Sequence, residues 1–86
     1  MAEQSNHIPT ETDLIKGCID GNPEMQRMLY QRFSSKMYGV CLRYGENPED
    51  ASDVLQDGFI KVYKSLNKFR GEGSFEGWIR RIFINT

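Results

Sequence analysis

The sequence predicts an all-α protein, a compact domain of three to four helices. Apolar residues recur at steps of three and four along most of its 86 residues, which is the period of a helix that buries one face. The pair Asn-Pro precedes two of these segments, where Asn can cap free N–H groups and Pro suits the first helical turn. No segment alternates like a half-buried strand, and the length allows one small domain.

The chain opens with a polar stretch and then a short helix. Residues 1–11 have no periodicity, so we expect a flexible leader followed by a folded domain over residues 12–86. The first helix is predicted over residues 12–20, with Thr12 as its N-cap and Gly21 as its stop signal. Its apolar stripe comprises Leu14, Ile15, Cys18 and Ile19.

Two long helices follow, one after each Asn-Pro pair. The first is predicted from Asn22-Pro23 to Gly45, and the second begins at Asn47-Pro48 and continues through Phe69. Their buried stripes are predicted to be Met25, Met28, Leu29, Phe33, Met37, Val40, Cys41 and Tyr44 in the first, and Ala51, Val54, Leu55, Phe59, Val62, Leu66 and Phe69 in the second.

A glycine-containing loop over residues 70–74 separates the last helix from the others. Ser74 can cap this helix, which begins at Phe75 and turns Trp78, Ile79, Ile82 and Phe83 to the core. No stop signal follows Ile84, so we expect the domain to be truncated within its last helix.

One large aliphatic residue falls on the polar face of the third helix. On a helical wheel Asp53, Asp57 and Lys64 lie opposite the apolar stripe with Ile60 in their midst, and Gln56 lies at the margin. An apolar side chain ringed by acids can bind a protein, with burial from the isoleucine and orientation from the carboxylates. A single stray exposed isoleucine is the other interpretation.

Charge divides the chain into an acidic front and a basic rear. Residues 1–60 hold five basic and ten acidic side chains, whereas residues 61–86 hold six and two. The rear also combines aromatic residues, glycines and arginines, a composition suited to unpaired nucleic acid, whose bases stack while basic groups follow the backbone. Arg81 and Asn85 lie one turn apart and form the better candidate pair for DNA, because Arg80 points elsewhere.

Other classes of function lack the residues they need. Asp53 and Asp57 have no nucleophile or base nearby, and Gly71-Glu72-Gly73 is not a phosphate loop, so we expect no enzyme and no cofactor. The single His7 and two isolated cysteines predict no metal site, and the cysteines are expected to be free thiols in a reducing cytoplasm. No apolar run approaches the roughly 20 residues of a membrane span.

Two motifs in this frame resemble bacterial sigma factors of the sigma-70 class. Residues 50–64, DASDVLQDGFIKVYK, resemble the signature helix of region 2, and residues 69–75, FRGEGSF, followed by Trp78-Ile79, Arg81-Ile82 and Asn85, are similar to the next block of the extracytoplasmic-function subgroup. The resemblance covers roughly residues 14–86. It implies a domain that docks on core RNA polymerase and recognises and opens the minus-ten promoter element.

The resemblance also implies roles for individual residues. Asp53, Gln56 and Asp57, with Ile60, would dock on a coiled coil of the polymerase β′ subunit. The loop would capture a base flipped from the non-template strand, and the DNA-binding residues would be Phe69, Arg70, Gly71, Ser74, Arg81 and Asn85. An anti-sigma factor is a further expected partner, and the expected location is the cytoplasm.

Two other functions stay open at this point. One is a helical protein-interaction module of a transcription regulator with an incidentally basic rear. The other is a helix-turn-helix protein that binds duplex DNA, which the loop over residues 70–74 disfavours because it is longer than the tight turn of that motif.

Overall fold

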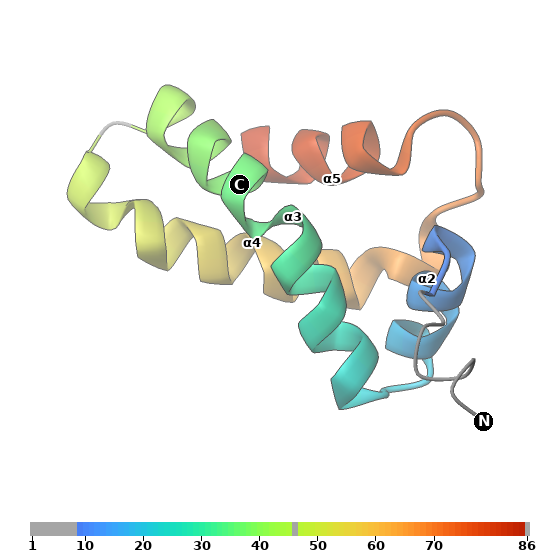
Figure 1. Cartoon of the computed structure of the whole chain (residues 1–86). Coiled ribbons are helices and arrows are strands. Elements are labelled where there is room, and N and C mark those ends of the chain that lie inside the picture. The colour runs from blue at the N-terminus through green and yellow to red at the C-terminus, as the bar shows by residue number, and fades with distance from the viewer. Residues whose placement is uncertain (1–8, 46, 86) are drawn as a thin grey trace.

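The computed structural model describes residues 9–45 and 47–85. Within these ranges the chain forms four α-helices, two short 3₁₀ segments and no strand, which confirms the predicted all-α class (Figure 1). The helices are α2 (Glu11–Ile19), α3 (Pro23–Tyr44), α4 (Ala51–Ser65) and α5 (Phe75–Ile84), and the 3₁₀ segments are η1 (Pro48–Asp50) and η2 (Leu66–Lys68).

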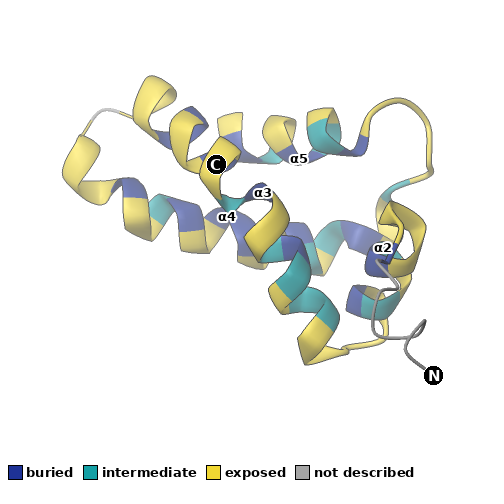
Figure 2. Ribbon diagram, in the orientation of Figure 1, coloured by how far each residue is buried: buried dark blue, intermediate teal, exposed yellow. Residues whose placement is uncertain are grey.

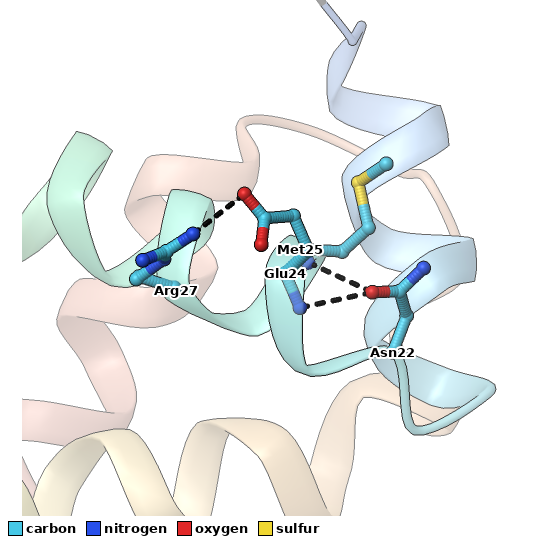
Figure 3. Close-up of polar contacts among 4 residues, drawn as sticks. All are labelled: Asn22, Glu24, Met25 and Arg27. Atoms are coloured by element: carbon cyan, nitrogen blue, oxygen red, sulfur yellow. Dashed lines mark hydrogen bonds and ion pairs between the residues drawn. The ribbon is translucent and has the colours of Figure 1, made fainter.

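Both Asn-Pro pairs begin a helical segment, as predicted. The Asn22 side-chain oxygen accepts hydrogen bonds from the backbone N–H groups of Glu24 at 2.9 Å and Met25 at 3.3 Å (Figure 3). Asn47 accepts one from the N–H of Glu49 at 3.0 Å, but it opens the 3₁₀ segment η1, and α4 starts only at Ala51.

The predicted cap of the first helix was wrong. Thr10, not Thr12, precedes the first turn: its hydroxyl accepts from the Asp13 N–H at 3.1 Å, and the Asp13 carboxylate accepts from the Thr10 N–H at 3.1 Å. Such a reciprocal pair needs a polar acceptor three residues after the cap, and Thr12 has Ile15 there. Pro9 is buried and its carbonyl accepts a hydrogen bond from Arg32, Thr10 caps α2 and Glu11 begins it, whereas residues 1–8 of the expected leader lie outside the described residues.

Most of the predicted stripe residues form one core. The largest fully buried side chains are Leu14, Leu29, Met37, Phe59, Val62, Leu66 and Ile79, and the other buried apolar residues are Cys18, Phe33, Val40, Cys41, Ala51, Leu55, Phe75 and Phe83.

Two stripe residues and one helix end were predicted wrongly. Ile19 is 48% exposed and Tyr44 is 59% exposed, because each is the last residue of its helix and lies beyond the cover of the neighbouring helices. The third helix ends at Ser65 and continues as η2, so Phe69 follows in extended backbone rather than on a helix.

A glycine allows α5 to lie against α4. Figure 1 shows α5 doubling back beside α4 after the loop, with α3 packed against both. Gly58 is buried in α4, and a Cβ atom there would collide with the ring of Phe83 in α5. On the other side of α4, the Tyr63 hydroxyl donates a hydrogen bond of 2.9 Å to the carbonyl of Gln26 in α3. These contacts hold the three longest helices in one arrangement.

Candidate docking and nucleic-acid surfaces

The outer side of α4 carries the four residues predicted to bind protein. Asp53, Gln56, Asp57 and Ile60 are all exposed and spaced at three or four residues, so they share one side of the helix. We call them the α4 face. The opposite side of α4 is buried in the core, and Figure 2 shows this alternation along the helix. The α4 face therefore lies on a helix whose position is set by packing.

The α4 face has no internal partner in the part of the chain that the structure describes. Asp53, Gln56 and Asp57 make no hydrogen bond or ion pair with described residues, and Ile60 is 49% exposed. Two carboxylates and an amide thus lie beside an aliphatic side chain, and no described residue pairs with any of the three. This arrangement can orient a basic partner and bury one apolar side chain of it.

The loop between η2 and α5 depends on two glycines. Gly71 and Gly73 have φ angles of 78° and 75°, in the left-handed region that other residues seldom adopt. A Cβ atom at either position would meet nothing within 4 Å, so the requirement is conformational and not steric. Arg70 and Glu72 are exposed beside them. The loop therefore presents backbone, one basic and one acidic side chain to solvent.

Phe69 anchors the beginning of this loop. Its ring lies 5.2 Å from that of Phe75 and 5.3 Å from that of Trp78, measured between centroids, and Phe75 in turn contacts Phe33 at 5.6 Å. Phe69 and Trp78 are half-buried, as partly buried residues packed on the core. Each ring thus supports the fold and keeps part of its surface exposed.

Ser74 anchors the end of the loop. Its hydroxyl accepts a hydrogen bond of 3.1 Å from the Gly77 N–H and caps α5, as predicted. With the aromatic cluster at Phe69 and this cap at Ser74, the four residues between them are held at both ends.

Arg81 and Asn85 line one open hollow of ≈ 380 Å³ between α4 and α5. Both are exposed, and Trp78 forms part of the same wall. Lys61 and Ser65 complete the hollow from α4. Sequence reasoning missed Lys61, which lies 20 residues before Arg81 and comes beside it only because α5 packs back on α4. The hollow combines two cations, an amide and part of an indole ring.

Burial perturbs three titratable groups, two cysteines in the core and Tyr63 packed against it, and none of them belongs to these surfaces. Desolvation raises the pKa of Cys18 to about 11 and that of Tyr63 to about 12, and it also raises the pKa of Cys41. Both cysteines are buried free thiols, so they are poor nucleophiles near neutral pH.

The described residues contain no cluster of three or more possible metal ligands. Among the helices described, none is long and apolar enough to cross a membrane.

The chain is similar to bacterial sigma factors. The sequence profile of Sigma-70 region 2 matches residues 29–86. The ECF RNA polymerase sigma-E factor of Haemophilus influenzae is 37% identical over 86 residues, all of this chain and 43% of that protein. The RNA polymerase sigma-H factor of Pseudomonas aeruginosa is 33% identical over 76 residues, covering 88% and 39%, and the sigma-E factor of Escherichia coli K12 is 34% identical over 77 residues, covering 90% and 40%.

The chain thus spans about two fifths of the length of these relatives. The matched region contains α4 with its exposed face, the glycine loop and α5, which are the elements that carry both candidate surfaces. The chain belongs to the sigma-70 family of sigma factors through its region 2 domain.

Proposed function

We propose that this domain docks on core RNA polymerase through the α4 face and recognises and opens the minus-ten promoter element through the loop and α5. The observation that carries the proposal is Ile60, a large aliphatic side chain that is 49% exposed among acids that pair with no described residue, on a helix whose opposite side is buried in the core. Such a patch suits a basic and apolar helical partner. Its proposed partner is the coiled coil of the polymerase β′ subunit.

The DNA side of the proposal assigns two kinds of role. Arg70 and Gly71 are proposed to meet an unpaired base of the non-template strand, since both are exposed, while Phe69 and Ser74 hold the ends of the loop. In the hollow, Arg81 would contact phosphate and Asn85 a base edge, where an amide offers a donor and an acceptor together. The polymerase supplies the chemistry, so the domain itself is proposed to be a non-enzymatic specificity subunit.

Two further parts of the proposal concern the surroundings of the domain. It acts in the cytoplasm with the polymerase, and an anti-sigma factor competes for one of its surfaces. Within the chain, we propose a folded unit whose described part begins at Pro9, three residues before the predicted boundary at residue 12.

Charge reversal on the α4 face tests docking. Asp53→Arg and Gln56→Ala should each weaken binding to core polymerase, with a loss of about tenfold or more for Asp53→Arg because like charges then oppose each other. Asp20→Arg is the matched control, an exposed acid at the end of α2. Binding can be followed by fluorescence anisotropy, and circular dichroism checks that each variant keeps its helices. Unchanged affinity for both α4 variants would contradict the proposed docking face.

Alanine variants in the hollow test DNA recognition separately. In the protein assembled with core polymerase, Arg81→Ala and Asn85→Ala should weaken binding to a single-stranded minus-ten oligonucleotide, and only Asn85→Ala should alter base preference. Arg27→Ala is the control, since Arg27 is exposed and paired with Glu24 at the start of α3. Retained promoter preference in both variants would leave a protein-interaction module as the better function.

A further inference from the structure

A second basic surface lies between α3 and α5. It is a groove of ≈ 350 Å³, and we call it the α3/α5 groove. Because the hollow containing Arg81 lies between α4 and α5, the two surfaces flank α5 on different sides. Arg80 and Arg81 are neighbours in sequence and line one surface each. The residues lining the α3/α5 groove include Lys36, Gly39, Arg43, Tyr44, Glu76 and Arg80.

Among the described residues that line this groove, cations outnumber acids by three to one. Glu76 accepts a hydrogen bond from Lys36 at 3.0 Å and lies 3.5 Å from Arg80, so one carboxylate steadies a lysine from α3 and an arginine from α5. Arg43 has no ion pair with any described residue. The side chains of Lys36 and Arg80 remain 62% and 52% exposed. The groove thus keeps an excess of positive charge on side chains that solvent reaches.

Gly39 contributes a second, independent observation. It lies in the interior of α3, where glycine disfavours the helix, yet a Cβ atom there would meet nothing within 4 Å. Packing inside the domain therefore does not explain the glycine, in contrast to Gly58. A glycine on the wall of a groove leaves helix backbone accessible, which is useful where a ligand approaches closely.

We propose that the α3/α5 groove binds the phosphodiester backbone of duplex DNA adjoining the unpaired strand. This inference rests on the proposed function, because the unpaired strand is the one assigned to the hollow on the other side of α5. Double-stranded DNA carries one charge per roughly 1.7 Å, which suits a row of cations. The lining residues that the structure describes include no Asn or Gln to read base edges and a single aromatic residue, Tyr44, so they do not offer the successive stacking platforms of a single-strand site.

Salt dependence distinguishes this contact from the others. The protein is assembled with core polymerase and titrated with two probes, a single-stranded minus-ten oligonucleotide and a fork that adds an upstream duplex arm. The plot of log affinity against log salt has a negative slope. In the variant Arg43→Ala/Arg80→Ala this slope should become shallower by about two for the fork, since each lost phosphate contact removes about 0.9 from its magnitude. The slope for the single strand should not change, and Arg27→Ala should leave both slopes as they are.

A substitution at Gly39 tests the groove without removing a cation. Gly39→Glu should weaken fork binding while the thermal midpoint does not fall, because the position has room and glutamate favours a helix. An unchanged salt slope for the fork in the double variant would overturn the proposal. A salt slope that becomes equally shallow for the fork and the single strand would also overturn it, because the groove would then be a single-strand site. Weaker core polymerase binding with normal DNA binding would overturn it in favour of an acidic protein partner.

The inference and the proposed function fail in different measurements. If Arg81→Ala and Asn85→Ala leave single-strand binding intact, the proposed DNA recognition fails irrespective of the groove. If those variants behave as expected and only the fork result is absent, the groove assignment alone is wrong.

Discussion

Gly39 and Gly58 both lie inside long helices, and replacing each with alanine is expected to change stability in different ways. Alanine in place of an exposed helix-interior glycine is worth about 0.8 kcal/mol in helix propensity. Gly39→Ala should gain this amount in free energy of unfolding, because the new methyl group meets nothing within 4 Å.

Gly58→Ala gains the same amount from helix propensity, but its new methyl group collides with the ring of Phe83. That ring is buried and lies 5.2 Å from the ring of Phe59, so it cannot swing into solvent without exposing core surface. Overpacking of this kind costs about 1–3 kcal/mol. Since helix propensity cancels between the two variants, Gly58→Ala should be about 2 kcal/mol less stable than Gly39→Ala. For a domain of this size that difference corresponds to roughly 10 °C in Tm.

Urea unfolding followed by circular dichroism at 222 nm measures both variants under the same conditions. Adding Phe83→Leu to Gly58→Ala supplies a further check, because a smaller side chain makes room for the methyl group and the pair should couple favourably by about 1 kcal/mol. Equal stability of Gly39→Ala and Gly58→Ala would refute the close packing of α5 on α4 described above.

The cap, the loop and the buried groups provide three further tests. Asn22→Ala should lower the free energy of unfolding by about 1 kcal/mol through loss of the cap of α3, as read from urea unfolding. Gly71→Ala should lower the free energy of unfolding by about 1–2 kcal/mol, because Gly71 has a positive φ that alanine seldom adopts. An unchanged urea midpoint would contradict that loop conformation. Burial raises the pKa of Cys18 to about 11 and that of Tyr63 to about 12, against ordinary values of 9.0 and 10.0. The native state thus keeps protons that the unfolded chain loses, so stability should be complete below pH 9 and fall from there to about pH 12. Urea midpoints between pH 8 and pH 11.5 measure this fall, which should be smaller in Tyr63→Phe.

Local signals in the sequence determined the helices and the composition of the core. Asn22 and Ser74 cap the helices that were expected of them, since a cap bonds to N–H groups only two or three residues away, whereas Asn47 caps the 3₁₀ segment η1 and not the long helix expected there. The exposure of the α4 face followed from the period of a helix, because α4 is buried on one side only. Thr12 was misassigned because a choice between two threonines depends on the residue three positions later.

Only the tertiary structure decided which distant residues share a surface. Lys61 joins Arg81 and Asn85 because α5 folds back on α4, which Gly58 permits. Lys36 and Arg43 belong to the acidic front of the chain by sequence, yet they lie with Arg80 in the α3/α5 groove. The physical reason is that helix packing depends on side-chain contacts between segments far apart in sequence, whereas period, caps and net charge are local properties. Charge counted along the chain therefore predicted one basic surface, and the packed helices present two.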